Sequence, residues 1–129
     1  MNFLFSATIH IPGDYSSIQS GIDAISTGDS ILVSFGTYYE NLIIDNKDIS
    51  IIAISDNTTL DGGGSGPVVS YFDVSESALL EGFTIRNGTG HPSSFSGLLF
   101  GGGIYCESSA PHLNQLNISG NTAFSGGGV

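Results

Sequence analysis

The fold is decided by one stretch of the sequence, Leu80-Glu81-Gly82-Phe83-Thr84-Ile85-Arg86-Asn87-Gly88, because the chain repeats its design. The second copy begins at Leu113, as the first begins at Leu80, and reads Leu113-Asn114-Gln115-Leu116-Asn117-Ile118-Ser119-Gly120-Asn121. Both copies place apolar residues at the first, fourth and sixth positions. The alternation slips at Gly82 and at Gln115, which predicts a bend or a bulge at the same point in each copy. Self-similar, strand-like units separated by a few tens of residues predict neighbouring layers of a β-solenoid.

A short helix is predicted ahead of these repeats, over residues 15–27. Ser16 and Gln19 form a capping-box pattern, and Gly28 is typical of a helix end. Three isoleucines recur at helical spacing: Ile18, Ile22 and Ile25. Because a helix with one apolar face must cover something, we expect it to cap the N-terminal end of the solenoid.

The rest of the chain reads as short apolar strands joined by Gly- and Ser-rich turns. The predicted strands are 7–11, 31–33, 42–44, 49–53, 58–60, 68–72 and 101–106, together with the two copies above. Residues 35–39 are expected to turn a corner, and residues 88–97 to form a protruding loop. Three strands per circuit with glycine at the corners predict an all-β fold, a parallel β-helix of about three to four circuits.

The C-terminal residues begin one more repeat. Gly101-Gly102-Gly103 returns as Gly126-Gly127-Gly128, and the sequence stops partway through that circuit. We expect either that the natural protein continues beyond residue 129, as a truncated chain would, or that two molecules cover each other's open ends.

Composition limits the choice of function. The chain has 129 residues, enough for a single domain over 1–129, with 12 acidic and 2 basic residues and a net charge of −10. This charge argues against nucleic acid and an anionic membrane surface as partners, whereas calcium and neutral glycans stay compatible. Cys106 is the only cysteine, so no intrachain disulfide forms. No apolar run has the length of a membrane helix, and residues 1–7 are either the tail of an export signal or a first strand.

Several segments carry a resemblance to a known family. The N-terminal ones are Pro12-Gly13-Asp14-Tyr15-Ser16-Ser17-Ile18-Gln19, Gly21-Ile22-Asp23-Ala24-Ile25, Gly28-Asp29-Ser30-Ile31-Leu32-Val33 and Gly36-Thr37-Tyr38-Tyr39-Glu40-Asn41. The later ones are Asp61-Gly62, Gly82-Phe83-Thr84-Ile85-Arg86-Asn87-Gly88 and Gly101-Gly102-Gly103-Ile104-Tyr105-Cys106. Together they resemble the first part of the pectin-lyase-like right-handed parallel β-helix proteins, including bacterial members. The resemblance implies a secreted or cell-surface location, and it covers pectate lyases, pectin methylesterases, epimerases and adhesins alike.

A few residues are candidates for a site. Asp56, Asp61 and Asp73 flank turns and would be calcium ligands if they met at one edge. Candidate ligand-binding residues are Glu81, Arg86, His91, Tyr38 and Tyr39. Glu81 and Arg86 are expected to pair on one outer face, and Asn87 and Asn121 to stack as an asparagine ladder. No catalytic residue is predicted, because the sequence contains no phosphate loop, nucleophile elbow or transition-metal spacing.

Three functions remain open at this point. The first is a non-catalytic β-helix scaffold or carbohydrate- or surface-binding module that self-associates through its open end. The second is the N-terminal part of a polysaccharide lyase or pectin esterase whose active site lies in later circuits. The third is a fragment that folds without a selected activity.

Overall fold

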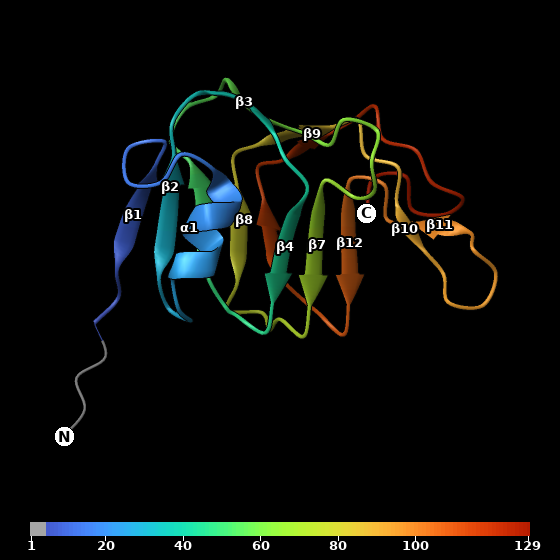
Figure 1. Ribbon diagram of the computed structural model, residues 1–129, viewed down its shortest axis with the longest axis horizontal. Coiled ribbons are helices and arrows are strands. Elements are labelled where there is room, and N and C mark those ends of the chain that lie inside the picture. The colour runs from blue at the N-terminus through green and yellow to red at the C-terminus, as the bar shows by residue number, and fades with distance from the viewer. Residues whose placement is uncertain (1–4) are drawn as a thin grey trace.

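The computed structural model describes residues 5–129, which form short, mostly parallel β-strands and one short helix (Figure 1). Residues 1–4, which hold most of the predicted N-terminal apolar segment, lie outside the described part of the chain. The elements in order are β1 Thr8–Ile11, α1 Ile18–Ala24, β2 Ser30–Val33, β3 Gly36–Tyr39, β4 Leu42–Asp45, β5 Ser50–Ala53, β6 Thr58–Asp61, β7 Val69–Phe72, β8 Leu79–Glu81, β9 Thr84–Arg86, β10 His91–Pro92, β11 Leu99–Phe100, β12 Ile104–Glu107, β13 His112–Asn114 and β14 Asn117–Ile118.

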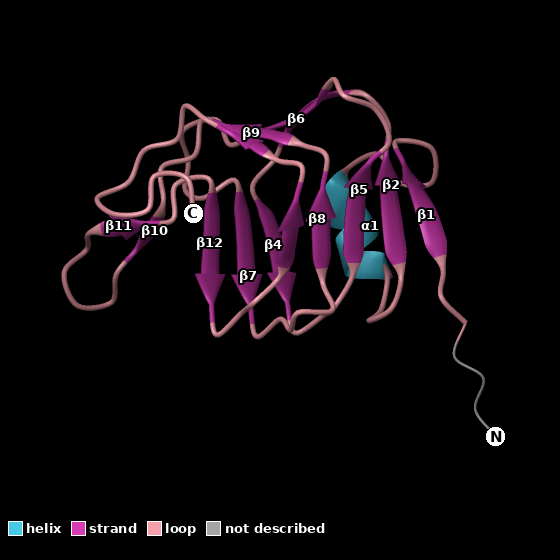
Figure 2. Cartoon of the chain, turned by 180° about the vertical axis from the view of Figure 1, so that it is seen from behind, coloured by secondary structure: helices cyan, strands magenta, loops and turns pink. Residues whose placement is uncertain are grey.

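The parallel strands belong to three sheets. Sheet A has the order β1-β2-β5-β8-β13, sheet B the order β14-β9-β6-β3, and sheet C the order β12-β7-β4. The chain passes through A, B and C in turn, as β2, β3 and β4, and the next pass, β5, β6 and β7, pairs with it strand by strand. Figure 2 shows β12, β7 and β4 of sheet C next to one another, and likewise β5, β2 and β1 of sheet A. The predicted all-β class, with parallel sheets and one short helix, is confirmed.

The two copies of the repeat are hydrogen-bonded neighbours, as predicted. Leu80 pairs with Leu113 and Ile85 pairs with Ile118, so the same offset along the chain is kept in both sheets that the repeat crosses. The expected bend is present in each copy, because Gly82 has a φ of 87° and Gln115, its equivalent, a φ of 51°. Leu80, Phe83 and Ile85 are buried in the core, at 0%, 1% and 0% exposure.

Residues 35–39 are not a corner, which corrects the prediction. They contain β3, whose Thr37 and Tyr38 pair in register with Thr59 and Leu60 of β6. The strand lacks the apolar pattern that predicts one. Its outward positions are polar and face solvent, and only Tyr38 packs against the core.

The helix is shorter than the predicted 15–27 and begins differently. Ser17, not Ser16, is the N-cap, and its Oγ accepts a hydrogen bond from the Ser20 amide at 3.1 Å. The carboxylate of Glu40 accepts hydrogen bonds from the backbone N–H groups of Ile18 and Gln19, each at 3.0 Å. These N–H groups have no acceptor within the helix, so a residue outside it satisfies them. The capping box therefore does not form.

Gln19 instead binds the edge of sheet C. Its Nε2 donates to the carbonyl of Ile43 at 3.1 Å, and its Oε1 accepts the Ile43 amide at 2.8 Å. The side-chain amide thus replaces a neighbouring strand beside β4, the N-terminal edge of that sheet. Ile18, Ile22 and Ile25 are buried, and each such side chain contributes about 1.5–3 kcal/mol. The helix therefore packs its apolar face against β1, β2 and β4.

The predicted loop at 88–97 carries structure of its own. β10 and β11 pair antiparallel, and the resulting hairpin projects from the body near β12 (Figure 1).

The two triple-glycine segments are in contact with each other. The amides of Gly102 and Gly103 donate to the carbonyls of Gly126 and Gly127, both at 2.9 Å. A Cβ on Gly103 would lie 2.6 Å from the carbonyl oxygen of Gly128, so only glycine allows this approach.

Candidate functional site

Three of the predicted site residues lie in one row across sheet B. Tyr39 of β3 is the register partner of Asp61 of β6, and Asp61 is the partner of Arg86 of β9. Paired residues of parallel strands point to the same face, about 4.8 Å apart. This is the outer face, because the adjacent residues Tyr38, Leu60 and Ile85 point into the core. We call Tyr39, Asp61 and Arg86 the sheet B row.

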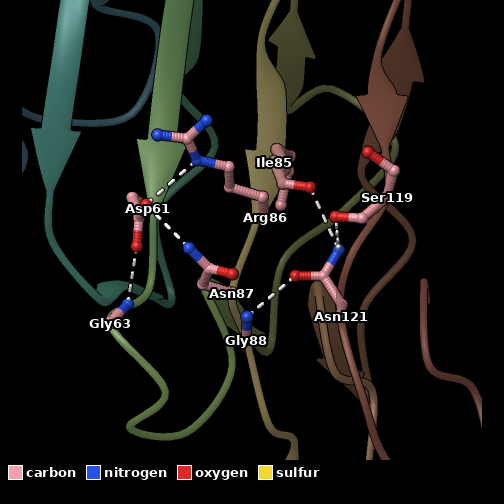
Figure 3. Close-up of polar contacts among 8 residues, drawn as sticks. All are labelled: Asp61, Gly63, Ile85, Arg86, Asn87, Gly88, Ser119 and Asn121. Atoms are coloured by element: carbon pink, nitrogen blue, oxygen red, sulfur yellow. Dashed lines mark hydrogen bonds and ion pairs between the residues drawn. The ribbon is translucent and has the colours of Figure 1, made fainter.

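Asp61 is the fixed centre of the row. Its side chain is only 6% exposed, its Oδ1 accepts the Gly63 amide at 2.9 Å, and its Oδ2 accepts Nε of Arg86 at 3.0 Å and Nδ2 of Asn87 at 2.9 Å (Figure 3). The Gly63 amide first, and then Arg86 and Asn87, hold the pKa of Asp61 below its ordinary value, although burial opposes them. The carboxylate is therefore ionised at neutral pH, and both of its oxygens are engaged.

The ion pair with Asp61 orients the Arg86 guanidinium but engages only its Nε. The guanidinium uses Nε for Asp61, and Figure 3 shows no dashed line to its two terminal nitrogens. No other side-chain hydrogen bond of Arg86 occurs within residues 5–129, and the side chain is 46% exposed. The arrangement therefore presents preoriented N–H donors to solvent.

The two candidate tyrosines of β3 differ in orientation. Tyr39 is 74% exposed on the outer face. Tyr38 points the other way, packs against the core and donates its hydroxyl to the carbonyl of Ser34 at 2.8 Å. Of the two, only Tyr39 is in a position to contact a ligand.

A cavity of about 460 Å³ opens beside the row, where the chain leaves sheet B. It is lined by successive turns, namely Gly63, Gly64, Asn87, Gly88, Thr89, Gly120 and Thr122. Asn121 holds these turns together, because its Oδ1 accepts the Gly88 amide at 2.8 Å and its Nδ2 donates to the carbonyls of Ile85 and Ser119 (Figure 3).

The predicted asparagine ladder is not formed in that corner. Asn87 lies beside Gly120 in the next layer. The backbone N–H of Asn87 donates to the Gly120 carbonyl at 3.1 Å, and both residues have a positive φ. The Asn87 side chain binds Asp61, whereas the Asn121 side chain binds backbone groups. The first copy ends in Asn-Gly and the second in Gly-Asn. Because the order is reversed, the side-chain amides of Asn87 and Asn121 occupy different positions along the turn and do not stack.

The remaining ligand candidates lie elsewhere. Glu81 belongs to sheet A and accepts Nδ2 of Asn114 at 2.6 Å, so the predicted pair with Arg86 is wrong. The bend at Gly82 turns β8 and β9 into different sheets, which separates the two side chains. The His91 ring stacks on Tyr105 with centroids 4.4 Å apart and contacts Phe72 at 6.1 Å, an arrangement that fastens the hairpin to sheet C.

The three candidate calcium ligands are not brought together. Asp56 lies between β5 of sheet A and β6 of sheet B, Asp61 ends β6 at the corner between sheets B and C, and Asp73 follows β7 where the chain leaves sheet C. Within residues 5–129 there is no group of three or more His, Cys, Asp or Glu side chains able to hold a metal ion.

The pairing of Asp61 with Arg86 was missed from the sequence, although a signal was present. The interval from Asp61 to Arg86 equals the interval between the two triple-glycine segments. Applying that circuit length to the charged residues would have placed the arginine beside Asp61 rather than Glu81.

Comparison with protein-family models finds no match, and neither does comparison with curated proteins. Among residues 5–129, no helix has the length and apolar character needed to cross a membrane.

Proposed function

We propose that the chain is a short right-handed parallel β-helix of the pectin-lyase-like type, with about three to four circuits and α1 as its N-terminal cap. We further propose that it acts without catalysis, as a scaffold that binds a neutral polysaccharide along the outer face of sheet B and self-associates through its C-terminal end. The passage of the chain through sheets A, B and C in a fixed order supports the β-helix. A right-handed crossover is the norm for parallel strands.

The sheet B row is the observation that carries the carbohydrate part. An exposed aromatic ring, Tyr39, stands in line with a fixed guanidinium, Arg86, on a regular surface of paired strands. Aromatic rings offer an apolar face with a polar edge, and a few placed polar groups then fix the orientation of the ligand. The neighbouring positions add a row of hydroxyls from Thr37, Thr59 and Thr84.

Charge favours a neutral polysaccharide. The protein carries a net charge of −10, so a polyanion approaching it meets repulsion. The charge of Arg86 is already balanced locally by Asp61 at 3.0 Å. What the row offers a ligand is hydrogen-bond donors and an aromatic face rather than a net positive field.

The state of Asp61 favours binding over catalysis. General acid–base catalysis works best with a group whose pKa lies near the working pH. The pKa of Asp61 is lowered, and its oxygens already accept three hydrogen bonds. Within the sheet B row, this carboxylate serves better as the anchor of Arg86 than as an acid or a base.

Self-association is supported by the last strands. Leu113, Leu116 and Ile118 are only partly buried, whereas their equivalents Leu80, Phe83 and Ile85 are fully buried. A further layer would cover them, and we propose that a second copy of the chain provides it. Light scattering should show a dimer or a larger species, and a monomer at high concentration would contradict this part.

A polysaccharide-binding experiment tests the main part of the proposal. Affinity for a panel of neutral polysaccharides and for polygalacturonate, with and without calcium, is measured by calorimetry for the unchanged chain, Tyr39→Ala and Arg86→Gln. Phe35→Ala is the matched control, because Phe35 is also 74% exposed, lies just before β3 and stands outside the row. We expect binding of a neutral polysaccharide, about tenfold weaker in each row variant, or roughly 1.4 kcal/mol, and unchanged in the control.

Three other outcomes would contradict the proposal. If no polysaccharide binds, or if the control weakens binding as much as Tyr39→Ala, the row is not a glycan site. Calcium-dependent cleavage of polygalacturonate would favour the alternative, the N-terminal part of a polysaccharide lyase or pectin esterase.

A further inference from the structure

Asn87 and Gly88 form the only Asn-Gly dipeptide of the sequence. In such a dipeptide the backbone nitrogen of the glycine can attack Cγ of the asparagine side chain, because glycine has no side chain to hinder the approach. A bond forms between this nitrogen and Cγ, the nitrogen loses its proton, and the side-chain nitrogen leaves as ammonia. Water then opens the succinimide ring and leaves aspartate or isoaspartate. Since the reaction needs only water, the local structure decides whether it occurs.

The fold requires both residues of the dipeptide. Asn87 has a φ of 60°, a left-handed conformation that asparagine tolerates better than most residues. A Cβ on Gly88 would overlap the carbonyl oxygen of Gly102 and would lie 2.9 Å from Cγ2 of Val68. The reactive pair is therefore built into this corner of sheet B.

The two reacting groups are held by opposite neighbours. Strand β9, which precedes the dipeptide, lies between β6 and β14 in sheet B. On the β6 side, Nδ2 of Asn87 donates to Asp61 at 2.9 Å, and on the β14 side the N–H of Gly88 donates to Oδ1 of Asn121 at 2.8 Å (Figure 3). The attacking nitrogen is thus bound to the next layer with its proton engaged, while the side chain that it must reach is bound to the previous layer.

We propose that Asn87 is a latent deamidation site, which Asn121 keeps closed in the folded protein and which reacts when this corner opens. Asn121 is well placed to control it, because its Nδ2 is fixed by the carbonyls of Ile85 and Ser119 at 3.0 and 3.1 Å, which directs Oδ1 toward Gly88. The rate of the reaction then follows the population of the locally opened corner. The inference does not depend on polysaccharide binding or on self-association.

The reaction would change the corner permanently. It replaces the Nδ2 donor of Asn87 by a carboxylate that faces the ionised carboxylate of Asp61, and two carboxylates at that separation repel each other. Because ammonia is lost, closing the corner again does not restore the asparagine. A single opening event would therefore leave a lasting mark beside the sheet B row.

The rate of deamidation tests the inference. The chain is incubated at mildly alkaline pH, well below its unfolding temperature, and conversion of Asn87 is measured by peptide mass spectrometry and an isoaspartate methyltransferase assay. The folded unchanged chain is compared with the same chain in guanidinium chloride and with Asn121→Ala. Ser17→Ala is the matched control, because it removes the N-cap of α1 and so lowers stability without touching the corner. Circular dichroism checks that each variant is folded.

Asn87 should react at least about tenfold more slowly in the folded chain than in guanidinium chloride, because only the opened corner reacts. Asn121→Ala should react about tenfold faster than the folded unchanged chain, since losing the hydrogen bond to Gly88 raises the opened population by roughly that factor. Ser17→Ala should react like the unchanged chain. In the folded unchanged chain, the Gly88 N–H should also exchange slowly with deuterium oxide.

Other results overturn the inference. Equal rates in the folded and unfolded chain would show that the fold gives Asn87 no protection, and an Asn121→Ala variant no faster than Ser17→Ala would remove the role of Asn121. If Asn121→Ala does not fold, hydrogen exchange of the unchanged chain decides. A Gly88 N–H that exchanges as fast as in an unfolded chain then refutes the inference.

The consequence for the corner has its own test. Asn87→Asp reproduces the aspartate product and should lower the melting temperature of the unchanged chain. It should lower it less in the Asp61→Asn background, where a carboxylate again meets an amide. Equal losses in the two backgrounds would refute the predicted repulsion from Asp61.

Discussion

The two copies of the repeat have the same design but do not have the same surroundings. Leu80 and Ile85 of the first copy have paired strands on both sides, in β5 and β13 for one and β6 and β14 for the other, and both are fully buried. Leu113 and Ile118 of the second copy have a paired strand on one side only and are half-buried. The comparison shows that the inward pattern of a segment fixes which residues face the core, whereas the neighbouring layers fix how much each of them stabilises the protein.

The largest difference is expected when a charge is placed at the same inward position of each copy. Ile85→Asp should cost about 4 kcal/mol or more and unfold the protein, since the carboxylate would face an apolar interior without a partner. Ile118→Asp should cost about 1–2 kcal/mol, because its side chain is only partly buried, on the last strand of sheet B. Urea unfolding followed by circular dichroism measures both, and equal losses would show that the two copies are equally buried in solution.

A middle-sized effect is expected at the corners that end the two copies. The first corner is fixed by the ionised Asp61 and the second by the amide of Asn121. Asp61→Asn should cost about 2 kcal/mol at pH 7, because it removes a charge-assisted acceptor and places an amide N–H against donor groups. Urea unfolding at that pH measures the loss, and a variant as stable as the unchanged chain would contradict it.

The same substitution should change the response to pH. The pKa of Asp61 in the folded protein lies below its ordinary value of 3.8, so the stability that this group contributes is complete above that value and is lost as the pH falls through the folded pKa. Asp61→Asn should therefore lose less stability than the unchanged chain between pH 5 and about pH 2. Asn121→Ala, which removes an uncharged anchor, should lower the free energy of unfolding without altering its pH dependence. An unchanged pH profile in Asp61→Asn would contradict the role given to the carboxylate.

The smallest effects are expected at the bends. Gly82 and Gln115 both have a positive φ, but a Cβ on Gly82 would lie 3.2 Å from the Ala53 carbonyl oxygen and from the Ala53 Cβ. Gly82→Ala should cost about 1–2 kcal/mol through backbone strain and crowding. Gln115→Gly should be neutral or stabilise by up to about 1 kcal/mol, since it relieves the strain of a left-handed residue. Thermal unfolding checks the pair, and a destabilised Gln115→Gly would mean that the glutamine side chain contributes a contact.

The repeat made much of the fold predictable, because paired strands of like design need the same spacing along the chain. The offset between the two copies predicted Leu113 as the partner of Leu80, and the repeated triple glycines lie against each other, since Gly102 and Gly103 donate to the carbonyls of Gly126 and Gly127. The inward positions followed from alternation. The helix boundaries did not follow, because its first amides are bound by Glu40, which is 21 and 22 residues away. β3 was missed because its outward residues are polar.

The site was harder to predict, since its geometry depends on turns rather than on strands. Glu81 and Arg86 are close in sequence, but the single bend at Gly82 sends them to different sheets. Asp61 and Arg86 are far apart in sequence, and the pairing of β6 with β9 joins them. The calcium candidates were chosen because each flanks a turn, and three turns of one circuit lie at three different corners.

The side-chain amide of Gln19 protects one edge of sheet C. By occupying both backbone groups of Ile43, it leaves no partner for an incoming peptide at that residue of β4, the edge strand of sheet C. Because an unpaired edge invites strands from other molecules, this contact protects the middle of β4, the strand of sheet C that a growing chain makes first.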